Sequence, residues 1–349
     1  MRIRRTFPIV LAVVVIAAAV ALAVQLRKHA PPEPARLLPG ADAFFYADLS
    51  RARKANSGKD LPPVSHDPEY EQFIRDTGFE FERDLDEAAF AIHYPARAAR
   101  TGAVDPRFSE VFIGKFDGVR LAAYLKQHAQ SVENYESVDI FSIAVEDRTL
   151  RTAILGADSV AASNVDDPAV IRGMVDRSRR LASPFGGPAL LRRYYRRVQF
   201  ASPIWGVAHV EPSSPMFGGW SDFLPHPADI VVSASYNPLH LPLHPGSLHI
   251  RAEALTLSDE DARSLAEKTN TFLLMFHNAE NAVGGRGNDP DVKAMFDSLQ
   301  IQLEGDRAVL SVSVPPGFLK KLLAGPQDQI PALGLQSPEP PASKKTTGR

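Results

Sequence analysis

The sequence has no cysteine among its 349 residues and almost no net charge. Without cysteine there is no disulfide framework, no thiolate nucleophile and no lipid-modified thiol, so the fold must be stabilised by burial of an apolar core. The 39 Lys and Arg residues nearly balance the 41 Asp and Glu residues, which gives a formal charge of -2. This balance produces no overall field that would attract nucleic acid, and we expect no nucleic-acid partner.

Motifs that define common enzyme classes are also missing. The sequence contains no G-x-S-x-G and no H-E-x-x-H, and its glycine pairs lack the following lysine of a phosphate-binding loop. His226, His240, His244 and His249 lie close together, but the prolines between them exclude the helical spacing typical of metal ligands. We therefore predict no catalytic residue, no cofactor and no metal site. A hydrolase that uses His209 or His226 stays open.

The N-terminus contains a long apolar run. Phe7 to Leu26 has 20 residues with one proline, one glutamine and no charge, and a helix of this length spans about 30 Å, the thickness of a bilayer core. Arg2, Arg4 and Arg5 precede the run and favour a cytoplasmic N-terminus. We predict a single-pass membrane anchor over residues 7–26, with the globular region extracytoplasmic. A cleaved signal peptide, indicated by two A-x-A sites, and a buried core helix stay open.

Proline is in excess, with 29 residues against about 17 expected for this length. Four prolines between Ala30 and Pro39 predict an extended linker directly after the anchor. The tail from 326 to 349 combines prolines and lysines with few large apolar residues, which predicts disorder.

Between the linker and the tail, hydrophobic periodicity predicts the same order of elements twice. Each half is expected to contain a strand, a helix and then short strands, with the two helices capped by Asp117 and Ser258. Alternating residues on both sides of Gly305 and Asp306 predict a hairpin. The predicted class is α+β: two similar halves with mostly antiparallel sheets and helices on one face.

The predicted organisation includes an internal duplication. Its parts are residues 1–29 (cytoplasmic tip and transmembrane anchor), 30–39 (linker), 40–182 (first α+β half), 183–199 (basic amphipathic connecting helix), 200–325 (second α+β half) and 326–349 (tail).

The opening of the globular region resembles a known group of proteins. Leu38-Pro39-Gly40-Ala41-Asp42 leads into an apolar stretch that ends at Leu49, and Gly78 to Leu85 follows it. Through these segments, and from Tyr135 to the helix near Val175, the chain resembles bacterial membrane-anchored proteins of the DUF3352 type. The resemblance covers about half of the chain. It implies an α+β outer domain and supplies no catalytic residues.

The connection between the halves contains a basic amphipathic segment. From Leu190 to Val198, apolar residues fall on one side of a helix and Arg192, Arg193, Arg196 and Arg197 on the other. Such a helix can lie on anionic lipid, bind an acidic partner or nucleic acid, or pack on the core with its arginines in solvent. We predict that these four arginines form a candidate membrane or partner surface.

The predicted function follows mainly by elimination. Because no catalytic motif is present, the chain is expected to be a non-catalytic scaffold or accessory component of the cell envelope, with an envelope protein as partner. The alternative is a small-ligand-binding module that uses the crevice between the two halves. Phe217 and Trp220, which flank paired glycines, are the candidate residues of its ligand loop.

Overall fold

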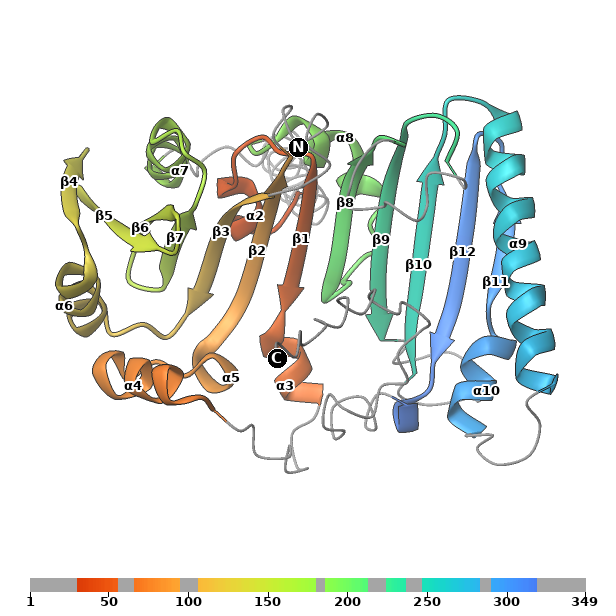
Figure 1. Cartoon of the computed structure of the whole chain (residues 1–349), viewed down its shortest axis with the longest axis horizontal. Helices are drawn as coiled ribbons and strands as arrows, with labels where there is room; N and C mark the ends of the chain where they lie inside the picture. Colours follow the sequence, from red (N-terminus) through yellow and green to blue (C-terminus); the bar gives the residue numbers. More distant parts are fainter. Residues whose placement is uncertain are drawn as a thin grey trace, which may run out of the picture.

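The computed structural model describes residues 30–55, 66–94, 106–179, 186–212, 224–236, 247–282 and 290–318. In these ranges the chain forms one 12-stranded sheet with the order β11-β12-β10-β9-β8-β1-β2-β3-β7-β6-β5-β4 (Figure 1). The strands are β1 (Ala43–Asp48), β2 (Leu85–His93), β3 (Arg107–Gly114), β4 (Ser131–Tyr135), β5 (Val138–Val145), β6 (Arg148–Ile154), β7 (Ser159–Ser163), β8 (Ile204–Val210), β9 (Ala228–Tyr236), β10 (Leu248–Leu255), β11 (Gln300–Leu303) and β12 (Arg307–Val314). The helices are α2 (Glu33–Leu37), α3 (Leu49–Ala55), α4 (Pro68–Thr77), α5 (Phe81–Asp84), α6 (Gly118–His128), α7 (Ala169–Arg179), α8 (Ala189–Tyr194), η2 (Tyr195–Arg197), α9 (Asp259–Ala282) and α10 (Pro290–Asp297).

The α+β class and the antiparallel pairing are confirmed, and one sheet extends through both predicted halves. β1 of the first half pairs with β8 of the second, so that Phe44 lies opposite Val207 and Tyr46 opposite Trp205. In each half, the first three strands lie side by side in chain order: β1, β2 and β3 in the first half, and β8, β9 and β10 in the second. The last strand of each half then pairs with the third. β7 pairs with β3 in the first half, and β12 pairs with β10 in the second.

The prediction that helices cover one face of the sheet is wrong. Ile140 of β5 belongs to the main core together with Met174 of α7, whereas its neighbour Phe141 packs with Leu121 and Leu125 of α6. Because successive residues of a strand point to opposite faces, α6 and α7 lie on opposite sides of the sheet. This arrangement agrees with the burial of the strands. β7 is buried at every position, so both faces of the sheet must be covered by other elements there.

The predicted helix starts and the hairpin are confirmed. Asp117 accepts hydrogen bonds at Oδ1 from the backbone N–H groups of Val119 and Arg120, both at 3.1 Å. Ser258 accepts one at Oγ from the N–H of Asp261, also at 3.1 Å. These side chains satisfy backbone donors that the first turn of a helix leaves unpaired.

The extended linker predicted for residues 30–39 is not observed, because Glu33–Leu37 forms α2. Pro34 lies in the first turn of this helix, where a missing N–H breaks no hydrogen bond. Leu37 and Leu38 are each 1% exposed and belong to the main core with α7 and α8. The segment after the predicted anchor is therefore part of the folded unit.

No helix in the described ranges is long and apolar enough to cross a membrane. The predicted anchor and the predicted tail both lie outside those ranges.

Candidate functional site

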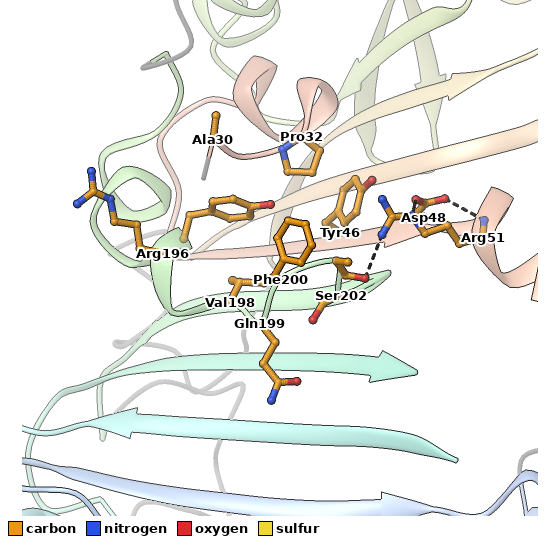
Figure 2. Close-up of a pocket in the computed structure, with 12 residues that line it drawn as sticks. Ala30, Pro32, Tyr46, Asp48, Arg51, Arg196, Val198, Gln199, Phe200 and Ser202 are labelled. Carbon is orange, nitrogen blue, oxygen red and sulfur yellow. Dashed lines mark hydrogen bonds and ion pairs between the residues drawn. The ribbon is translucent and has the colours of Figure 1, made fainter. Parts of the chain in front are cut away.

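A cavity of about 350 Å³ lies where β1 meets β8, at the boundary between the two halves (Figure 2). We call it the junction cavity. Its lining comes from Ala30 and Pro32, from β1, from Arg51 of α3 and from the connection between α8 and β8, where Tyr195, Arg196 and residues 198–202 contribute. The cavity is thus built from segments that are far apart in the sequence.

Aromatic rings from both halves form one side of the junction cavity. Tyr46 of β1 stacks on Trp205 of β8 with ring centroids 5.2 Å apart, and Tyr195 meets the same indole edge-on at 5.3 Å. Tyr46 and Phe200 face the same space, and the guanidinium of Arg196 points away from it (Figure 2). The lining therefore offers ring surfaces together with hydrogen-bonding groups.

Two charged residues in the lining of the junction cavity, Asp48 and Arg51, form an ion pair. Asp48, 7% exposed, accepts hydrogen bonds from Ser50 Oγ at 2.7 Å and from the backbone N–H of Arg51 at 3.0 Å. The Arg51 guanidinium pairs with the Asp48 carboxylate at 2.8 Å and donates to the carbonyl of Ala201 at 3.0 Å. This ion pair ties the connecting loop to β1, and each of the two charges is balanced by the other.

A half-buried carboxyl group contacts the hydroxyl of Tyr46. The Tyr46 hydroxyl donates to Glu87 Oε2 at 2.9 Å. Burial raises the pKa of the Glu87 carboxyl above its usual range. Burial, followed by the charge of Glu87, raises the pKa of the Tyr46 phenol as well. The pair holds the Tyr46 ring in place.

Ser202 has a buried hydroxyl without a hydrogen-bond partner among the described residues. It lines the junction cavity and is 7% exposed. Buried polar groups are almost always hydrogen-bonded in folded proteins, so the Ser202 hydroxyl is a polar group in the cavity wall whose usual partner is missing among the described residues. The preceding residue, Ala201, has a positive φ of 61°. Strained backbone of this kind is concentrated at functional sites.

A second cavity, of about 550 Å³, lies next to the junction cavity and opens on one face of the sheet at β9, β10 and β12. We call it the sheet-face cavity. Gln199 and Phe200 line both cavities and separate them. Ser235 donates to Gln199 Oε1 at 2.9 Å, and Ser313 Oγ lies 2.9 Å from His249 Nδ1. No local pattern in the sequence predicts this polar cavity, because its residues become neighbours only through strand pairing.

The predicted amphipathic segment forms α8 and η2. Leu191 and Tyr194 are buried in the main core, and all four arginines lie on the exposed side. Arg197 also pairs with the buried Glu253 of β10 at 3.5 Å, and Arg193 lies over the ring of Tyr194. The division into an apolar and a basic side is therefore observed.

The two histidines considered for a hydrolase each pair with a carboxylate. His209 Nδ1 lies 2.7 Å from Asp229 Oδ1, and His226 Nδ1 lies 2.9 Å from Asp261 Oδ1. Within the described ranges neither histidine contacts a serine or threonine hydroxyl that could serve as a nucleophile. Among the residues that the structure describes, the base–nucleophile contact that a serine hydrolase requires is therefore not observed at either histidine.

The His209–Asp229 pair predicts a pH dependence of stability. The hydrogen bond to Asp229, which also accepts from the hydroxyl of Tyr194, raises the pKa of His209 above its ordinary value of about 6.5. The protonated form is therefore favoured in the folded state, and its contribution is complete below the unfolded pKa. We expect the free energy of unfolding to fall as the pH rises from about 6.5 through the raised pKa. The free energy of unfolding, measured with urea at several pH values in this range, should change less with pH in His209→Gln than in the wild type. An identical pH dependence of the two proteins would contradict the prediction.

One cluster could offer ligands to a cation. His66, Glu80 and Glu82 each bring a ligand atom within 4.8 Å of the others. However, His66 Nδ1 already lies 3.1 Å from Glu71, and Arg83 donates to Glu80 at 2.8 Å. Glu82 of α5 also accepts a hydrogen bond from Tyr70 of α4 at 2.8 Å, so we assign this cluster the structural role of connecting α4 with α5.

Several residues named from the sequence lie outside the described ranges. They are Phe217, Trp220, His240 and His244.

No protein-family model matches the chain, and no curated protein matches it. Among solved structures, crystal forms of a protein designated TP0453 are similar at 10% sequence identity. Form IV has a TM-score of 0.43 and form III one of 0.42, each covering 84% of this chain and 98% of that protein. Form I has a TM-score of 0.39. At this similarity the matches carry no argument about family or function, and the resemblance to the DUF3352 type stays a prediction.

Proposed function

We propose that the chain is a membrane-anchored extracytoplasmic protein whose junction cavity binds a small ligand. The buried, unpartnered hydroxyl of Ser202 in an aromatic-lined cavity is the observation that supports this function most. A volume of about 350 Å³ lies at the lower end of the usual range for ligand pockets. In this proposal the junction cavity takes the place of the crevice considered from the sequence, and it is lined by described residues alone.

The predicted membrane anchor determines where the junction cavity would lie in this proposal. Ala30 lines the junction cavity, and the apolar run ends at Leu26. Four residues reach at most about 14 Å when extended. A helix over residues 7–26 would therefore hold the cavity close to the membrane surface.

Internal duplication is also part of the proposal. The matching order of connections on the two sides of the β1–β8 pair supports it, because each half returns its last strand beside its third. The junction cavity would then lie at the boundary between two copies of one ancestral unit.

Ligand binding can be tested by native mass spectrometry of the full-length chain extracted from membranes. We expect a bound small molecule in the wild type and its loss in Ser202→Phe, because the larger side chain would fill the cavity. Ser131→Phe, at the exposed edge strand β4, is the matched control and should keep the ligand. If no ligand is bound, or if Ser202→Phe binds it equally well, the proposed function is wrong.

The exposed arginines of α8 and η2 support a second role, contact with anionic lipid. Because Arg197 is engaged with Glu253, the sharpest variant changes only Arg192, Arg193 and Arg196 to Gln. At roughly 1 kcal/mol per arginine, residues 30–325 should bind anionic liposomes roughly a hundredfold more weakly.

The control for the lipid experiment removes the same charge elsewhere. Changing Lys115, Lys126 and Lys293, all exposed, to Gln should leave liposome binding unchanged. Equal losses in both triple variants would indicate a nonspecific charge effect, and unchanged binding in the arginine variant would exclude the lipid surface. The scaffold function stays a prediction, and in-cell crosslinking to one envelope protein would support it.

A further inference from the structure

We infer that the ligand is an unbranched, neutral oligosaccharide that extends from the junction cavity over Phe200 into the sheet-face cavity. The inference rests on the proposed function and adds the chemical class of the ligand and a second binding region. Gln199 and Phe200 line both cavities, so a linear ligand can occupy the two without crossing a covered stretch of surface.

The compensated charges favour a neutral ligand. In the junction cavity Asp48 pairs with Arg51 at 2.8 Å. In the sheet-face cavity Arg251 pairs with Glu253 at 2.9 Å and with Glu304 at 3.5 Å. A phosphate or carboxylate ligand would have to compete with these carboxylates for the guanidinium groups. A hydroxyl group can instead donate to a carboxylate or accept from a guanidinium while each ion pair stays intact.

The sheet-face cavity is lined mainly by neutral hydrogen-bonding side chains. Ser235, His249 and Ser313 are direct neighbours across β9, β10 and β12. Arg251 and Ser311 are direct neighbours in the next row that faces the same side. Each serine hydroxyl offers one donor and two acceptor positions, which suits a ligand rich in hydroxyl groups. The first row extends over two strand spacings, or roughly 10 Å.

Phe200 provides an apolar surface in the middle of this polar region. Its side chain is 70% exposed, which is unusual for a phenylalanine between two polar cavities. Tyr46 and Tyr195 line the junction cavity beside it. The C–H face of a sugar ring can pack on an aromatic ring while its hydroxyl groups bond to the surrounding side chains. Single-stranded nucleic acid also stacks on aromatic rings, but its phosphates need unpaired cations along the groove.

Isothermal titration calorimetry on the full-length chain can test the inference, in a detergent without a sugar headgroup. The probes are neutral oligomers of glucose and of N-acetylglucosamine, from dimers to hexamers. We expect affinity to rise with chain length and to be insensitive to salt, because no charge is paired on binding. Phe200→Ala should weaken hexamer binding at least tenfold. Phe272→Ala, which removes another exposed ring on α9, should leave binding unchanged.

The variants separate this inference from the proposed function. Ser202→Phe should weaken binding of every oligomer, whereas Ser311→Val should weaken binding of hexamers and spare dimers. If a molecule bound in the junction cavity is charged, or if no oligosaccharide binds while Ser202→Phe still displaces a native ligand, the oligosaccharide inference is overturned and the proposed function stands. If neither experiment detects a ligand, both are overturned.

Discussion

Trp205→Ala should lower the free energy of unfolding by about 3–5 kcal/mol. The Trp205 side chain is 1% exposed, lies opposite Tyr46 in the β1–β8 pair and stacks on that ring. Removing the indole therefore leaves a void in the main core and takes away the support of both tyrosines of the junction cavity. Urea unfolding, followed by circular dichroism on residues 30–325, would measure the loss.

Trp205→Phe is the matched control for that measurement. It keeps an aromatic ring at the same position and removes the indole N–H, which has no hydrogen-bond partner among the described residues. The lost N–H should therefore cost no hydrogen bond, and we expect a loss of only about 1–2 kcal/mol. If the two variants were equally unstable, the stacked core around Trp205 could not be the source of the effect.

Glu253→Ala should destabilise the protein by about 2–3 kcal/mol. Glu253 is 6% exposed and its carboxylate contacts Arg251 at 2.9 Å, Arg307 at 3.3 Å and Arg197 at 3.5 Å. Removing it leaves three guanidinium groups close together without their shared counterion. The loss stays below the largest values known for buried ion pairs because the arginine side chains are between 26% and 37% exposed.

Glu304→Ala tests whether the burial of a carboxylate determines how much its contacts with Arg251 and Arg307 stabilise the protein. Glu304 contacts Arg251 at 3.5 Å and Arg307 at 3.3 Å, but its side chain is 37% exposed. Solvent screens such a pair, so we expect a loss below about 1 kcal/mol in the same urea experiment. Equal losses for Glu253→Ala and Glu304→Ala would show that burial does not control the strength of these contacts.

Local patterns in the sequence predicted much of the secondary structure. The caps at Asp117 and Ser258 and the hairpin around Gly305 were confirmed because each depends on residues only a few positions apart. The extended linker was wrong, because proline counts alone do not distinguish an extended segment from a short helix with proline in its first turn.

The candidate site depends on contacts that no local pattern contains. Arg51 and Ala201 are 150 positions apart when their hydrogen bond forms, and His249 meets Ser313 only through the pairing of β10 with β12. The sequence suggested a crevice between the halves, but it could not show which residues line it. The helices on both faces were missed for a similar reason, since the strands were not known to belong to one sheet.

The pairing of β1 with β8 has a consequence for how the chain is made. Ala43 pairs with Ala208, so one edge of β1 stays open until the whole first half, the connecting segment and β8 have been synthesised. At usual translation rates this interval lasts roughly 10–30 s. An open edge with apolar residues is a template for pairing with other chains. We therefore expect the newly made first half to be the stage at which pairing with other chains competes most with folding.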